Sequence, residues 1–133
     1  MIKNAIHYVS FEELQTIKAK TPDGFYVVEL DGSQIQTEQE YFSYVWKAFN
    51  FPPMPRHSWN GYDDWIRDLT WLNDKVGFVV IFLNFTEFLK NAPETKKEVI
   101  DDFNEIVLPF WEHEVEECVV GGTPKPFNVY IVD

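Results

Sequence analysis

The chain has very little cysteine, and this scarcity narrows its chemistry. Cys118 is the only cysteine among 133 residues, so no disulfide can form within the chain and no zinc site can be built from several cysteines. Such sparing use of cysteine is typical of a reducing compartment, and we expect a cytoplasmic location. Cys118 itself is expected to be a small, buried or half-buried residue.

Long apolar runs and a targeting segment are also missing. The longest apolar stretches, such as Phe78 to Leu83, are far too short to cross a bilayer. The amino-terminal residues lack the apolar segment and the cleavage site of a signal peptide. We therefore expect no association with membranes.

Positive charge is scarce, because 11 basic residues face 22 acidic ones and the net charge is −11. Such a charge repels nucleic acid and membrane surfaces and attracts basic partners. Solubility alone explains the same imbalance equally well, and composition does not separate the two explanations. We expect no binding of nucleic acid.

Catalytic motifs are absent as well. The chain contains no glycine-rich phosphate loop and no G-x-S-x-G element, and its three histidines are far apart. Asp64 and Asp68 are four residues apart on a predicted helix, where two carboxylates could hold Mg²⁺ or act as acid and base. They could equally form an exposed acidic face. We expect no catalytic residue, no metal and no cofactor. An enzyme is the least favoured of three possible functions, the other two being binding functions.

The residues that are abundant predict a folded domain with a parallel sheet. Aromatic residues make up 17% of the chain, which excludes a disordered protein. Phe25–Leu30, Phe78–Leu83 and Phe127–Val132 are apolar segments rich in β-branched and aromatic residues, and they read as strands. Because helical segments connect them, we expect an α/β fold with a three-stranded parallel sheet packed with helices.

Capping signals and apolar spacing place the helices. An extra amino-terminal helix is expected from about Ser10 to Lys20, in a helical extension of residues 1–24 that precedes a domain of residues 25–133. A second helix begins at Thr37, a third runs from Ser58 to about Leu72, and a fourth begins with Pro93. Pro109 is expected to end or kink that fourth helix.

Two adjoining stretches resemble the barstar family. LDGSQIQTEQEYFSYVWKAFNFP is similar to the opening of a barstar domain, and SWNGYDDWIRDLTWL is similar to the family's next helix motif. The remaining elements follow the family's order, so the resemblance covers about residues 25–133, with an insertion around residues 109–125. It implies a small acidic intracellular protein that inhibits a ribonuclease by plugging its active site.

The resemblance also implies which residues meet the partner. Asp64 matches the family's central interface aspartate, whereas Asn60 stands where a second aspartate is usual. Asp63 replaces an aromatic residue, Met54 stands where a tyrosine is usual, and His57 belongs to a pair that replaces a glycine and an acidic residue. From the later helix, Glu105 is the best match to a contacting glutamate, with Glu112 as its rival.

The spacing of residues supports the same face independently. Asn60, Asp64 and Asp68 are four residues apart on the third predicted helix, opposite its apolar side. Trp59 and Trp65 flank this face and could serve as interface anchors or as core residues. The predicted partner-binding residues are Asp64, Asn60, Asp68, Asp63, His57, Met54 and Glu105.

The resemblance thus predicts an immunity or antitoxin protein, monomeric when free, whose partner is a basic ribonuclease. The core positions match the family better than the interface positions do. This difference indicates a changed partner, because specificity is altered at the interface while the core is kept. An adaptor with the same fold and a partner that is not a nuclease is the alternative.

Overall fold

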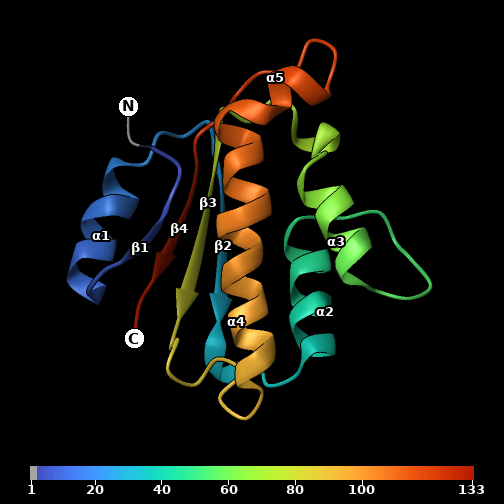
Figure 1. Ribbon diagram of the computed structural model, residues 1–133. Helices are drawn as coiled ribbons and strands as arrows, with labels where there is room; N and C mark the ends of the chain where they lie inside the picture. Colours follow the sequence, from blue (N-terminus) through green and yellow to red (C-terminus); the bar gives the residue numbers. More distant parts are fainter. Residues whose placement is uncertain (1–2) are drawn as a thin grey trace.

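Four parallel strands form the centre of the molecule in the computed structural model, which describes residues 3–133 (Figure 1). The strands are β1 (Ile6–Tyr8), β2 (Phe25–Asp31), β3 (Gly77–Leu83) and β4 (Phe127–Ile131), in the spatial order β1-β4-β3-β2. Every residue of β4 is buried, as is expected for a strand with neighbours on both sides and helices on both faces. The predicted α/β class and the parallel sheet are confirmed.

The predicted number of strands is wrong, because β1 adds a fourth. Its three residues offer no apolar run, and alternation cannot be recognised over so short a segment. The strand exists because Ile6 pairs in parallel with Val129 at the edge of β4. The side chain of Asn4 strengthens this edge, since its Oδ1 accepts a hydrogen bond from the amide of Phe127 at 3.0 Å. Residues 1 and 2 of the expected extension lie outside the described residues.

One face of the sheet carries the large core. Helix α2 (Glu38–Ala48) begins with the predicted capping box of Thr37 and Glu40, and buries Phe42, Val45 and Trp46. Helix α3 (Trp59–Ile66) lies beside α2, and helix α4 (Pro93–Asp102) lies in front of the sheet and runs along its strands (Figure 1). The predicted strand Phe25–Leu30 supplies Val28 and Leu30 to the same core.

The chain stays helical past Pro109, which was expected to end or kink the helix that begins with Pro93. Two π-helical stretches, Phe103–Val107 and Phe110–Glu114, follow it and lead directly into α5 (Val115–Cys118). The amide of Leu108 bonds to the carbonyl of Phe103, five residues back, so the turns around the proline are wide. We call residues 93–118 the long helix. Cys118 at its end is exposed, so the expectation of a buried or half-buried cysteine was wrong.

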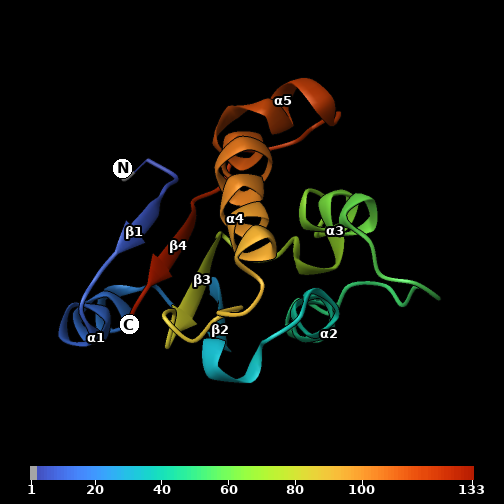
Figure 2. The same cartoon turned by 60° about the horizontal axis from the view of Figure 1, so that its bottom comes forward.

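The opposite face of the sheet is covered by α1 (Phe11–Lys20) (Figure 2). This predicted helix is confirmed, with the side chains of Ser10 and Glu13 forming its capping box. Leu14 and Ile17 of α1 pack on a small second core whose buried members include Val79 and Ile81 of β3. None of the helices in residues 3–133 combines the length and the apolar character needed to cross a membrane.

Candidate protein-binding site

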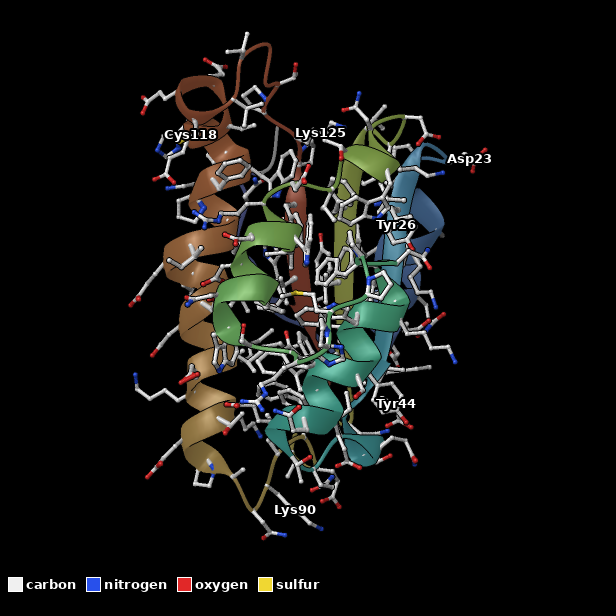
Figure 3. All side chains as sticks on the ribbon, turned by 90° about the vertical axis from the view of Figure 1, so that its right-hand side faces the viewer. Asp23, Tyr26, Tyr44, Lys90, Cys118 and Lys125 are labelled. Carbon is white, nitrogen blue, oxygen red and sulfur yellow. The ribbon has the colours of Figure 1, made fainter. Side chains whose placement is uncertain are left out.

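Helix α3 and the loop before it form the candidate site, on the side of the molecule seen in Figure 3. The helix begins at Ser58, whose hydroxyl accepts a hydrogen bond from the amide of Gly61 at 3.1 Å. Tyr62 and Ile66 point into the core and are fully buried. The opposite side of the helix exposes Asn60 and Asp64, and we call this surface the α3 face.

Asp64 is the most accessible acidic group of the α3 face. Its side chain is 75% exposed, and its Oδ1 lies 3.8 Å from Nη2 of Arg67. An exposed ion pair at this distance contributes little to stability. The carboxylate therefore loses little free energy when it leaves Arg67 to pair with another cation. Asn60 lies one turn earlier on the same side and is also exposed.

Asp68 lies in the turn that follows α3, and not within a helix that runs to about Leu72 as expected. The helix ends at Ile66 and not near Leu72, because Leu69 adopts a left-handed conformation (φ 53°) that turns the chain into the core. Leu69 is then only 2% exposed. Asp68 sits in this turn, where its Oδ1 accepts a hydrogen bond from the amide of Thr70 at 3.2 Å. The predicted extent of this helix, from Ser58 to about Leu72, is therefore wrong.

The loop before α3 is held by its own side chains. The imidazole of His57 stacks on Trp46 of α2, with ring centroids 4.2 Å apart. The sulfur of Met54 lies 3.3 Å from Nε1 of Trp65 and packs on Gly61, where an added Cβ would approach it to 2.8 Å. Both residues are half-buried, so they shape the loop while remaining within reach of a partner.

The two tryptophans of α3 pack against the core in the free protein. Trp59 donates its indole N–H to the carboxylate of Glu38 at 3.1 Å. Trp65 lies edge-on to Trp71, with ring centroids 5.9 Å apart. Each remains half-buried, so each still offers part of a ring beside the α3 face.

The long helix presents Glu105 on its exposed surface. The rival residue, Glu112, is half-buried, and its Oε2 accepts a hydrogen bond from the amide of Asn4 at 3.0 Å. Glu112 therefore serves to attach the amino-terminal segment. Glu105 is the better candidate for contact with a partner.

Asp63, next to Asp64, points inward to the long helix, where it meets Asp102. Burial and the hydrogen bond to Asp63 raise the pKa of Asp102 to about 9. The Oδ1 atoms of both residues are buried and have no hydrogen-bond partner in residues 3–133. Sequence reasoning missed this pair, because spacing along one helix does not reveal contacts with another. The one available signal was that Asp63 replaces an aromatic residue.

A cleft of ≈ 730 Å³ lies beyond the end of α3, lined in part by Arg67, Lys75, Trp111 and Lys125. Its basic groups are already used within the protein: Nζ of Lys125 donates to the carbonyls of Asn73 and Lys75. The cleft also lies near the amino-terminal ends of β3 and β4, whereas ligands of parallel sheets bind at the carboxyl ends. We therefore place the candidate site on the α3 face and not in this cleft.

Residues 3–133 contain no group of three or more His, Cys, Asp or Glu side chains that could hold a metal ion.

A protein-family model described as "Barstar (barnase inhibitor)" matches residues 25–122. The chain belongs to the barstar family. The match begins with β2 and includes α2, α3 and the long helix, so it contains the whole candidate site. It leaves out β1, α1 and β4. No curated protein and no solved structure matches the chain.

Proposed function

We propose that this member of the barstar family inhibits a basic ribonuclease by covering its active site with α3 and the preceding loop. The observation that carries the proposal is the position of Asp64. The resemblance matches Asp64 to the family's central interface aspartate, and Asp64 lies on a capped helix with its side chain 75% exposed. A ribonuclease active site is rich in cations that bind phosphates, and an exposed carboxylate offers such cations a substitute.

The charge of the whole molecule supports the same partner. A net charge of −11 attracts a basic protein before contact and increases the rate of productive encounters. The exposed carboxylate of Asp64 then provides a local target at the centre of the α3 face. This long-range attraction is screened over about 8–10 Å at physiological salt, so added salt is expected to slow association.

The packing beneath the α3 face supports tight binding. His57 is stacked on Trp46, Met54 is held by Trp65 and Gly61, and the buried side of α3 includes Tyr62. A surface that is already ordered loses little conformational entropy when a partner binds. The site is therefore suited to a protein that binds as a rigid plug.

The other predicted contact residues take different places in this proposal. Asn60, Met54 and His57 surround Asp64, and Glu105 contributes from the neighbouring long helix. Asp63 contributes from the side of α3 that faces the long helix. Asp68 lies at the margin of the proposed interface. The proposed setting is the cytoplasm, with the protein monomeric when free, acting as an immunity or antitoxin protein without catalytic activity of its own.

An adaptor with a partner other than a nuclease is the second candidate. Asn60 in place of an acidic residue and Met54 in place of an aromatic residue favour it, because both are substitutions at interface positions of the family. The adaptor would use the same α3 face, so mutations there do not distinguish it. Inhibition of RNA cleavage does.

The test measures cleavage of a fluorogenic RNA by barnase and by other basic ribonucleases, with increasing amounts of the purified protein. We expect stoichiometric inhibition of at least one enzyme. Asp64→Ala should weaken it, and Asp74→Ala is a matched control, because Asp74 is 77% exposed and lies 3.9 Å from Lys75. Equal inhibition by both variants would remove the α3 face from the proposal. Inhibition of none of the enzymes would favour the adaptor.

A further inference from the structure

Asp63 of α3 and Asp102 of the long helix form a carboxyl pair. No ion pair with a basic side chain neutralises it within residues 3–133. Each has one carboxyl oxygen that is buried and lacks a hydrogen-bond partner in residues 3–133. The nearest cation is engaged elsewhere: Nε of Arg67 donates to the backbone carbonyl of Asp63 at 3.0 Å, and its Nη2 is directed to Asp64. Two carboxylates in such a position would repel each other strongly.

The groups around the pair come from three helices. Tyr41 of α2 and Tyr62 of α3 are buried beside it, and their hydroxyls hydrogen-bond to each other at 2.8 Å. Glu98 of the long helix adds a negative charge, and only Arg67 at the end of α3 acts in the opposite direction. Burial is the largest of these influences, and together they raise the pKa of Asp102 to about 9.

We propose that Asp63 and Asp102 share one proton that fastens α3 to the long helix, and that a cation brought to α3 by the partner expels this proton. The shared proton turns a repulsive pair into an O–H···O⁻ hydrogen bond, which joins the two elements that the proposed interface spans. This first step concerns the free protein alone. The second step, expulsion on binding, rests on the proposed function.

Proton release follows from the charge of the partner. A guanidinium or ammonium near α3 favours the ionised form and lowers the pKa of Asp102. Binding then frees a proton, and the pair gains a negative charge at the moment when a positive charge arrives. By linkage, affinity should rise with pH from neutrality up to the pKa of the free pair, by at most about tenfold per pH unit for one proton.

The shared proton is tested on the free protein by following the carboxyl carbons of Asp63 and Asp102 in an NMR titration of the intact chain. We expect a transition of the pair well above neutral pH. Asp102→Asn should abolish this transition while leaving the amide spectrum of a folded protein, and Asp63→Asn provides a second variant. Complete ionisation of both carboxyls below about pH 6, near the ordinary range of these groups, would overturn the proposal.

Expulsion on binding is tested by calorimetry, with barnase as the probe and buffers of different ionisation heat near neutral pH. The wild-type protein should release more protons on binding than Asp102→Asn does. The difference should be a measurable fraction of a proton per complex and at most about one. Barnase contributes the same protons in both titrations, so the difference belongs to the pair. Equal release would overturn the linkage. Absence of any binding would overturn inhibition of barnase and the linkage step, whereas the NMR titration decides the shared proton in either case.

Discussion

Two neighbouring aspartates on α3 show how the same side chain does different work on two sides of one helix. Asp64 lies on the exposed α3 face, where water solvates its carboxylate and a partner can reach it. Asp63 lies against the long helix beside Asp102, where burial disfavours a second charge. The exposed side suits recognition of a partner. The buried side suits the holding of a proton and the fixing of the helix.

The largest expected effect comes from removing the exposed carboxylate of Asp64. Asp64→Ala should reduce affinity for a basic ribonuclease by about 2–5 kcal/mol, because it leaves a buried cation of the partner unpaired. That range is taken from close charge pairs such as those between barnase and barstar. Calorimetry with an inhibited ribonuclease measures it, and Asp74→Ala should change affinity by less than about 0.5 kcal/mol. Equal effects of the two variants would mean that the α3 face is not the interface.

The next effect concerns stability on the buried side. Tyr62→Phe should lower the free energy of unfolding by about 1–3 kcal/mol, because it leaves the hydroxyl of Tyr41 buried without its 2.8 Å hydrogen bond. Urea unfolding measures the change. The double variant with Tyr41→Phe should lose less than the sum of the two single variants. Strict additivity would show that the two hydroxyls contribute independently.

A smaller effect should appear as a dependence of stability on pH. The folded protein holds the proton of Asp102 up to a pKa of about 9, above the ordinary value of 3.8, so the unfolded chain ionises first. Stability from this group is therefore fully present below about pH 4 and decreases as the pH rises to about 9. Asp102→Asn cannot ionise and should be more stable at neutral pH by about 1 kcal/mol, a modest value because the group is partly exposed to solvent.

Urea titrations of wild type and Asp102→Asn at acidic, neutral and alkaline pH check this expectation. The advantage of the variant should shrink toward acidic pH, where wild type also carries a neutral group. An advantage that is constant with pH would show that the substitution acts through packing alone. Wild type that is the more stable protein at every pH would contradict the shared proton.

The smallest effect tests the position of Asp68. Because its carboxylate lies in the turn after α3 and accepts a hydrogen bond from Thr70, Asp68→Ala should change affinity by less than about 0.5 kcal/mol. Direct comparison with Asp64→Ala on the same ribonuclease measures the contrast. A loss similar to that of Asp64→Ala would mean that Asp68 belongs to the interface together with Asp64.

The sequence predicted the elements whose signals are local. The capping boxes at Ser10 and Thr37, Pro93 at the start of a helix and three apolar strands were all correct. Each depends on side chains and backbone within about one turn of each other, so the pattern itself contains the cause. The placement of Asp64 on an exposed helix face belongs to the same kind.

The elements that were missed depend on distant partners. β1 is too short to be recognised and is formed by pairing with β4, more than a hundred residues away. The third helix stops before Leu72 because burial of Leu69 outweighs continuation of the helix. The wide turns around Pro109 keep the chain helical, so Pro109 does not end the long helix.

The sequence by itself determined the fold class and the acidic helix, because these follow from apolar periodicity, caps and charge that are local in the chain. The family was indicated by the resemblance of two stretches to barstar domains. Only the tertiary structure decided that Asp63, next to the exposed Asp64, meets Asp102 from another helix. The properties of a carboxyl group depend on its burial and on the charges beside it in space. Folding brings those neighbours together. Two adjacent aspartates that look alike in the sequence therefore differ, because Asp64 carries an exposed charge and Asp63 is proposed to share a proton.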